Sequence, residues 1–105
     1  MKIALIQQKA TQNIQHNIEK GIASVRTAAE KKAKIICFAE LAFTPFYPQK
    51  KSEGQNLVLA ETIPGCTTNL FSSIAKELGV VIILNLYENL NGKTFDSSPV
   101  IDADG

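Results

Sequence analysis

Glu40 is the residue of this chain whose type and setting point most directly to chemistry. It follows a short apolar run, residues 35–39, and precedes the apolar and aromatic residues 41–43. A carboxylate in such surroundings must be paired, protonated or placed at the mouth of a cleft, because burial of an unpaired charge is costly. The ends of strands in α/β proteins are where catalytic groups collect. Glu40 is therefore a candidate general base with hydrophobic walls to tune its pKa, and an exposed loop residue is the alternative.

The two cysteines are weaker candidates. Cys37 lies three residues before Glu40 on the same expected strand, so strand alternation points the two side chains to opposite faces. Cys66 lies in a Pro-Gly turn, where it is expected to shape or cap the helix that follows. Their spacing is not that of a metal site, and we expect both to be reduced thiols.

Three other reactive side chains have plain structural interpretations. His16, the only histidine, lies on an expected helix among polar residues, which favours a solvated side chain. Lys93 belongs to an expected hairpin turn. Glu88 is a second acid at an expected strand end, where an exposed loop role is favoured over a place at the border of a pocket.

Composition limits the class of protein. The 105 residues form one domain at most, with 45% hydrophobic residues, 20% charged residues and a net charge of +1. Such a balance is ordinary for a globular protein and offers no basic surface for nucleic acid. The longest apolar runs are too short to span a bilayer and no signal-peptide layout is present, so we expect no membrane association and a cytoplasmic location.

The first half of the chain predicts strand, helix and strand. Residues 2–7 form a short apolar run, expected in the middle of a sheet. Thr11 or Asn13 can cap the helix that follows. A second strand then leads into Glu40, and Pro45 breaks the chain into a loop that includes the polar residues 49–56. The helix is predicted by apolar residues at intervals of three and four: Ile14, Ile18, Ile22, Val25 and Ala29.

The second half predicts a helix followed by strands. Residues 57–60 are apolar enough for an edge element, and residues 61–65 form a turn. Thr67 or Thr68 is expected to cap a helix that closes at Gly79. Residues 80–87 read as one buried strand, and Asn91-Gly92 predicts a hairpin whose returning strand spans 94–102, with Pro99 at an edge or bulge. The order is that of an α/β fold with helices covering one face of the sheet.

Four segments occur together in an order that resembles the carbon-nitrogen hydrolase (nitrilase) superfamily. They are the opening KIALIQ strand, the CFAELAFTPFYP segment, the IPGCTT turn with the helix ending KELGVVIILNLYE, and the NGKTFDSSPVIDADG hairpin. Ala39 stands where that family usually has proline. The ELAFTPFYP sequence is most similar to the corresponding segment of amidases that act on N-carbamoyl compounds.

The resemblance implies a fold and a reaction. The fold is α/β, the N-terminal portion of a four-layer αββα sandwich, with residues 1–105 as an incomplete hydrolase domain. The reaction is hydrolysis of a non-peptide carbon-nitrogen bond in a small amide, carbamoyl or nitrile substrate by a Glu, Lys, Cys triad, without a cofactor, in a homo-oligomer. Glu40 matches the glutamate. The family's lysine and cysteine follow the IDADG-type turn, beyond residue 105, so we expect this fragment to be inactive alone.

Two alternatives belong to other classes. A non-catalytic α/β interaction module would pair with another chain through an incomplete sheet. A small flavodoxin-like nucleotide binder is disfavoured, because residues 7–11 after the first strand contain no glycine for a phosphate loop.

Overall fold

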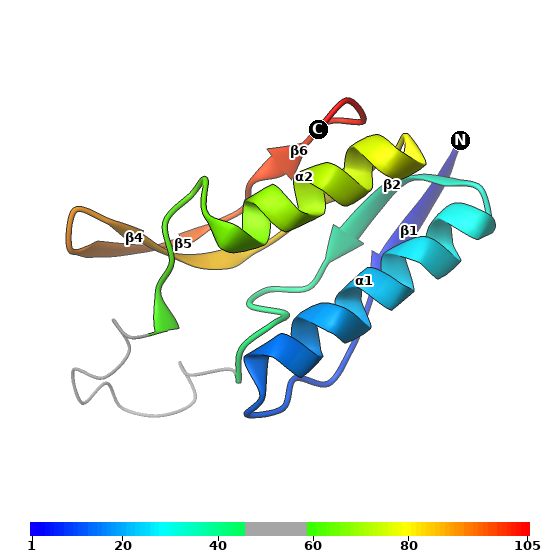
Figure 1. Cartoon of the computed structure of the whole chain (residues 1–105). Helices are drawn as coiled ribbons and strands as arrows, with labels where there is room; N and C mark the ends of the chain where they lie inside the picture. Colours follow the sequence, from blue (N-terminus) through cyan, green and yellow to red (C-terminus); the bar gives the residue numbers. More distant parts are fainter. Residues whose placement is uncertain (46–58) are drawn as a thin grey trace.

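A computed structural model of the chain describes residues 1–45 and 59–105 (Figure 1). The elements follow one another as β1 (Lys2–Ile6), α1 (Ile14–Glu30), β2 (Ala33–Phe38), α2 (Cys66–Leu78), β3 (Val81–Ile83), β4 (Leu86–Leu90), β5 (Lys93–Ser97) and β6 (Val100–Ile101). The expected loop 49–56 lies outside the described residues, as do residues 57 and 58 of the expected edge element. Glu61, shortly after, forms an isolated parallel bridge with Glu88 of β4.

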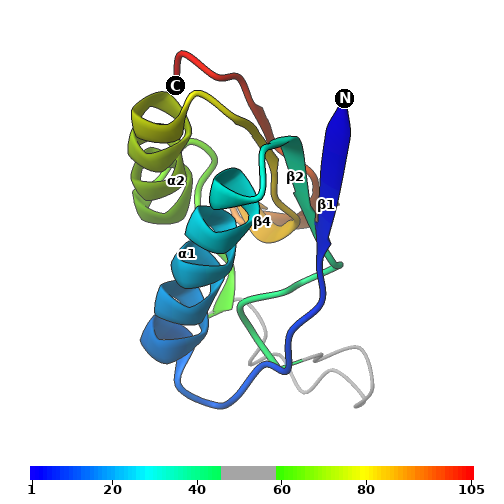
Figure 2. The ribbon, with the colours of Figure 1, turned by 90° about the vertical axis from the view of Figure 1, so that its right-hand side faces the viewer.

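The main sheet has four strands in the order β1-β2-β3-β6. β1 and β3 are parallel to β2, and β6 is antiparallel to β3. Both helices lie on the same face of this sheet, as predicted (Figure 2). The expectation that the first strand lies inside the sheet was wrong, because β1 forms one edge among the described strands and its Leu5 is 79% exposed.

Helix α1 confirms the predicted apolar stripe. Ile18 and Val25 are buried, and the other members of the stripe pack against the core. Of the two expected caps, Asn13 is the N-cap, since its side-chain oxygen accepts a 3.0 Å hydrogen bond from the backbone N–H of His16. The helix therefore begins where the sequence places it.

Helix α2 has its predicted end but a different start. Gly79 closes it in the left-handed conformation, with φ of 64°. Its N-cap is Gly65, whereas Thr67 and Thr68 are buried in the first turn, so the expected threonine cap was wrong. The Thr68 hydroxyl instead accepts a 2.7 Å hydrogen bond from the backbone N–H of Gly65, which satisfies the cap from inside the helix.

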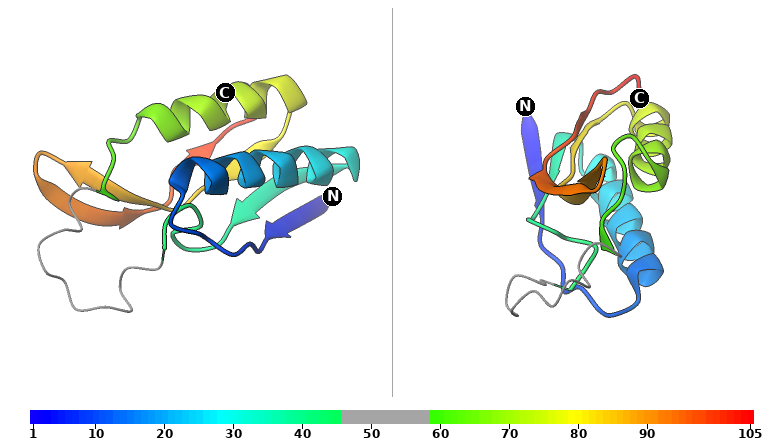
Figure 3. Two further views of the ribbon diagram at one scale, coloured as in Figure 1. Left: turned by 60° about the horizontal axis from the view of Figure 1, so that its bottom comes forward. Right: turned by 90° about the vertical axis from the view of Figure 1, so that its left-hand side faces the viewer.

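The run 80–87 is divided between two strands, so the expectation of one buried strand was wrong. β3 ends at Ile83, and β4 begins at Leu86 in a separate two-stranded sheet with β5. The predicted Asn91-Gly92 turn joins β4 to β5, with positive φ at both residues. The returning segment also divides, into β5 and β6. Figure 3 shows the β4–β5 hairpin extending away from the helices and the main sheet.

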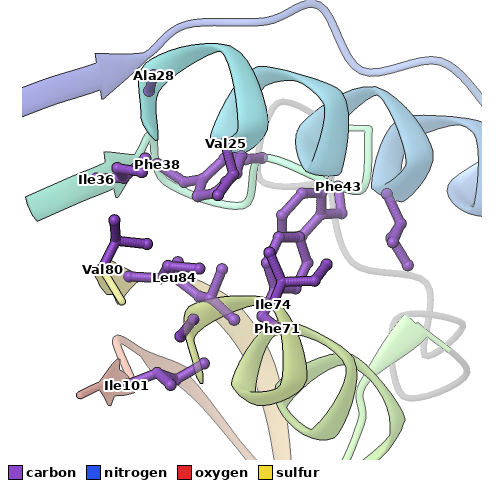
Figure 4. Packing of buried hydrophobic residues seen from close by; sticks show 14 of the residues in the cluster. Val25, Ala28, Ile36, Phe38, Phe43, Phe71, Ile74, Val80, Leu84 and Ile101 are labelled. Carbon is purple, nitrogen blue, oxygen red and sulfur yellow. The ribbon is translucent and has the colours of Figure 1, made fainter. Parts of the chain in front are cut away.

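One apolar core lies between the two helices and the sheet (Figure 4). Three aromatic rings form its centre: the ring of Phe38 lies 5.0 Å from that of Phe43 and 5.6 Å from that of Phe71, measured between centroids. Phe43 follows Glu40 by three residues, so the core anchors the segment that carries the candidate acid. Neither helix in residues 1–45 and 59–105 has the length and apolar character needed to cross a lipid bilayer.

Candidate functional site

Three polar residues lie at matching positions beyond the ends of neighbouring strands. Glu40 comes two residues after β2, Asn85 comes two residues after β3, and Ser98 comes two residues before β6. β2 and β3 are parallel and β6 is antiparallel, so all three positions fall at the carboxyl edge of the β2 and β3 strands. This edge is where an α/β sheet places its functional groups.

The turn that carries Glu40 is tied to Asn85. Glu40 begins a turn in which the next residue, Leu41, has φ of 49°, and the backbone N–H of Leu41 donates a 2.8 Å hydrogen bond to Asn85 Oδ1. The side chain of Leu41 is buried. The backbone on the C-terminal side of Glu40 is therefore held by a side chain from another strand end as well as by packing.

The amide nitrogen of Asn85 contacts the β4–β5 hairpin and the residue that follows β5. Its Nδ2 donates to Asp96 Oδ1 at 2.7 Å and to Ser98 Oγ at 3.0 Å. The Asp96 side chain is also within hydrogen-bonding reach of Glu40, and this hydrogen bond, together with the Asp96 charge, raises the pKa of Glu40 above its ordinary value. Two carboxyl groups thus meet beside one amide.

Glu40 is exposed, so the hydrophobic walls expected around it are not what tunes its pKa. The order of strand, acid and loop is confirmed, because β2 ends at Phe38 and the turn follows. The residues after Glu40 turn their side chains into the core, which leaves the acid at the surface. Glu40 borders a shallow groove whose wall includes the cation Lys9 and the amide of Gln8.

The turn is supported from beneath by α1. The fully buried Asn17 donates a 2.9 Å hydrogen bond from Nδ2 to the backbone carbonyl of Phe43, and its Oδ1 accepts from Thr11. Gly21 leaves room for the aromatic rings, because a Cβ added there would lie 2.7 Å from Cε1 of Phe43. These contacts fix the position of the Glu40 turn relative to α1.

Neither cysteine belongs to the cluster of Glu40, Asn85 and Asp96. Cys37 is half-buried in β2 with its thiol 3.5 Å from the carbonyl oxygen of Phe38, and Cys66 is the first, exposed residue of α2. Both are free thiols, as expected. The alternation argument for Cys37 and Glu40 does not apply, because Glu40 lies beyond the strand.

The three remaining candidates, His16, Lys93 and Glu88, lie outside the Glu40 turn. His16 is exposed on α1, as expected. Lys93 is exposed and opens β5 directly after the hairpin turn. Glu88 is not at a strand end: it lies in the middle of β4, half-buried, where its Oε1 accepts a 2.7 Å hydrogen bond from Ser97 Oγ.

Asn85 and Asp96 were not identified from the sequence. Asn85 interrupts an apolar run, which is a signal that the run is not one continuous strand. Asp96 is an ordinary acid on a hairpin, and only the path of the chain between β5 and β6 brings it to Glu40. The sequence pattern therefore indicates the break at Asn85 but not the approach of Asp96 to Glu40.

The layers define a mixed α/β protein whose candidate acid lies at the carboxyl edge of its main sheet. The same fold occurs in the crystal structure of a carbon-nitrogen hydrolase from Helicobacter pylori G27, with a TM-score of 0.86 at 22% identity, over 97% of this chain and 35% of that chain. It also occurs in an amidase from Nesterenkonia sp., with a TM-score of 0.70 at 19% identity, over 99% of this chain and 39% of that one. The chain thus has the architecture of the N-terminal portion of the nitrilase-type αββα sandwich.

The family model for carbon-nitrogen hydrolases matches residues 2–105, and the chain belongs to this family. An N-carbamoylputrescine amidase from Solanum lycopersicum is 34% identical over 104 residues, which are 98% of this chain and 34% of that protein. The omega-amidase NIT2-B from Xenopus laevis is 30% identical over 105 residues, 99% of this chain and 36% of that protein. The chain spans about a third of the length of these relatives.

Proposed function

We propose that residues 1–105 supply the general base of an amide-hydrolysing enzyme, and that this base is Glu40. The observation that carries the proposal is the position of Glu40 in a chain of this family: it lies two residues after β2, on a turn held by Asn85 and by the core. Its pKa is raised above the ordinary glutamate value, which is the direction that makes a carboxylate a stronger base.

Glu40 accepts a proton and returns it twice in the reaction assigned to it. It first accepts the proton of a cysteine thiol, whose sulfur attacks the amide carbon; the carbon-nitrogen bond then breaks as Glu40 returns this proton to the leaving amine. Glu40 next accepts a proton from the water that attacks the thioester, and returns it to the cysteine sulfur as the carbon-sulfur bond breaks and the acid is released. A lysine ammonium stabilises the oxyanion in each step. The cysteine and the lysine are those that the family resemblance places beyond residue 105, so we expect the 105-residue chain alone to be inactive.

The substrate class is a small amide, with N-carbamoyl amines as the first choice. The relatives at 30–34% identity are named N-carbamoylputrescine amidase and omega-amidase, and both names describe cleavage of a non-peptide carbon-nitrogen bond. We propose that the reaction takes place in the cytoplasm without a metal or an organic cofactor.

The test is an amidase assay of the full-length gene product that contains this chain, with N-carbamoylputrescine and simple ω-amides as substrates. Glu40→Gln keeps the shape of the side chain and removes the base, so kcat/KM is expected to fall by about 10²–10⁴-fold. Glu30→Gln, an exposed change of the same kind at the end of α1, is the matched control and keeps wild-type activity. Full activity in Glu40→Gln would overturn the proposal.

Self-association is a second candidate property, favoured by the sheet face that the helices leave uncovered. On this face Ile3, Leu5 and Val100 are 57%, 79% and 66% exposed, although they are apolar. We infer that two copies of the 105-residue chain pack through this face, because exposed apolar side chains gathered on an uncovered sheet face favour association. The interaction-module alternative rests on the same surface.

Sedimentation velocity tests the association. The wild-type chain is expected to sediment as a dimer, and Leu5→Lys as a monomer with an unchanged circular dichroism spectrum, since it places a charge on the shared face. Lys34→Ala, which changes an exposed residue of β2, is the control. A wild-type chain that remains monomeric over about a 100-fold range of protein concentration would contradict the inference.

A further inference from the structure

The Asn85 amide connects two parts of the chain that are far apart in sequence. Through Oδ1 it accepts the N–H of Leu41 at 2.8 Å, and through Nδ2 it donates to Asp96 at 2.7 Å and to Ser98 at 3.0 Å. An amide oriented by three partners has one rotamer and one flip state that satisfy them all. The Asp96 carboxylate and the backbone next to Glu40 are therefore fixed relative to each other.

The Asp96 side chain fits a role beyond that of a hairpin residue. It lies opposite Tyr87 in the β4–β5 ladder, at the end of the hairpin next to the main sheet. One of its oxygens accepts from Asn85, and the carboxyl group as a whole is within hydrogen-bonding reach of Glu40. Two carboxyl groups form such a bond only when one of them carries a proton.

We propose that Asp96 and Asn85 are positioning residues for Glu40: Asn85 orients the Asp96 carboxylate, and Asp96 holds the Glu40 carboxyl group and the proton that it accepts. This inference rests on Glu40 being the general base. Neither residue needs to touch the substrate. Their contribution is to aim the acid and to make it a stronger base than a solvated glutamate.

Two charged side chains and one neutral amide lie around Glu40. Asp96 faces it from β5 and is the group that raises its pKa. Lys9, in the segment between β1 and α1, borders the same groove as Glu40. The Asn85 amide is neutral and donates its N–H to Asp96, which orients that carboxyl group beside Glu40.

Two substitutions are expected to move the pKa of Glu40 in opposite directions. Asp96→Asn removes the neighbouring charge and lowers the pKa of Glu40 toward its ordinary value. Asn85→Asp keeps the acceptor for the Leu41 N–H but replaces the donor with a carboxylate, so it raises the pKa of Glu40 further. A role of Asp96 in folding alone, with its charge remote from Glu40, would leave the pKa of Glu40 unchanged in Asp96→Asn.

The measurement is a carbon-13 NMR titration of the Glu40 carboxyl group in the 105-residue chain, at low ionic strength because salt screens exposed charges. Asp104→Asn is the matched control: it removes one exposed carboxylate from the turn after β6 and is expected to leave the Glu40 midpoint unchanged. An unchanged midpoint in Asp96→Asn, or shifts of the same sign in both variants, would overturn the proposal.

Activity gives an independent readout in the full-length gene product. The acidic limb of the pH profile of kcat/KM is expected to move to lower pH in Asp96→Asn and to higher pH in Asn85→Asp, with KM nearly unchanged. The failures are distinguishable. If Glu40→Gln retains activity, the general-base role is wrong, whereas loss of activity in Glu40→Gln with unmoved limbs in the other two variants refutes only the positioning role.

Discussion

Asn17 Nδ2 donates a 2.9 Å hydrogen bond to the backbone carbonyl of Phe43, so the buried face of α1 holds the turn that carries Glu40. The same amide nitrogen donates to the carbonyl of Thr11 at 2.8 Å, and Asn17 Oδ1 accepts from the N–H and hydroxyl of Thr11. One buried side chain thus joins the segment after β1 to the segment after β2. Burial of this polar group is tolerated because all of its hydrogen-bonding atoms are paired.

Replacement of Asn17 by alanine is expected to lower the free energy of unfolding by about 3 kcal/mol, because it leaves the buried carbonyl of Phe43 and the part-buried backbone groups of Thr11 without these partners. Urea denaturation followed by circular dichroism measures the change. Asn69→Ala, at an exposed position of α2, is the control and should stay within about 0.5 kcal/mol of the wild type. Equal stability of the two variants would show that the Asn17 network is not structural.

Replacement of Gly21 by alanine is expected to destabilise the chain even though alanine favours helix formation. The added Cβ would lie 2.7 Å from Phe43 and 3.2 Å from Phe38, and both rings belong to the packed core. Overpacking typically costs about 1–3 kcal/mol, more than the gain of up to about 1 kcal/mol in helix propensity. Thermal unfolding checks the sign: a higher midpoint for Gly21→Ala would mean that the rings move aside freely.

Replacement of Gly92 by alanine tests the hairpin that presents Asp96. Gly92 has φ of 82° and no atom near its would-be Cβ, so the cost is conformational and amounts to about 1 kcal/mol. The β4–β5 register is expected to persist, because ladder pairs fix it on both sides of the turn. Lys93→Ala, the exposed neighbour, is the control in the same urea experiment, and a larger loss there than at Gly92 would contradict this account.

The stability of the chain is expected to carry a pH dependence that comes from Glu40. Its pKa is raised in the folded state by the hydrogen bond and charge of Asp96, so the folded state binds a proton more readily than the unfolded state. The stabilisation that this provides is complete below the ordinary glutamate pKa and is lost as the pH rises through the raised pKa. Other carboxylates titrate nearby, so the quantity to measure is the difference between wild type and Glu40→Gln.

That difference is obtained from urea denaturation at a series of pH values. The wild type should lose stability relative to Glu40→Gln as the pH increases through this window, and the two curves should run parallel above it. The trend should vanish when the comparison is made in an Asp96→Asn background. A wild type that gains stability relative to Glu40→Gln with rising pH would mean that the pKa of Glu40 is lowered in the folded state.

The sequence by itself determined the local structure and the candidate acid. Apolar spacing predicted α1 and its stripe, Thr11 or Asn13 was the expected start of that helix, Gly79 was the expected end of α2, and Asn91-Gly92 predicted the hairpin. Each of these depends on neighbours within one or two turns of chain. Glu40 was selected by its position after a strand, which is also a local property. Its role as the general base stays a prediction.

Only the tertiary structure decided what surrounds that acid. The division of residues 80–87 into β3 and β4 depends on which sheet each half joins, and the place of β1 at an edge depends on strand order. The meeting of Glu40 with Asp96 joins positions 56 apart in the sequence through Asn85. Hydrophobic periodicity does not predict such contacts, because they depend on how separate strands are brought together at one edge of the sheet.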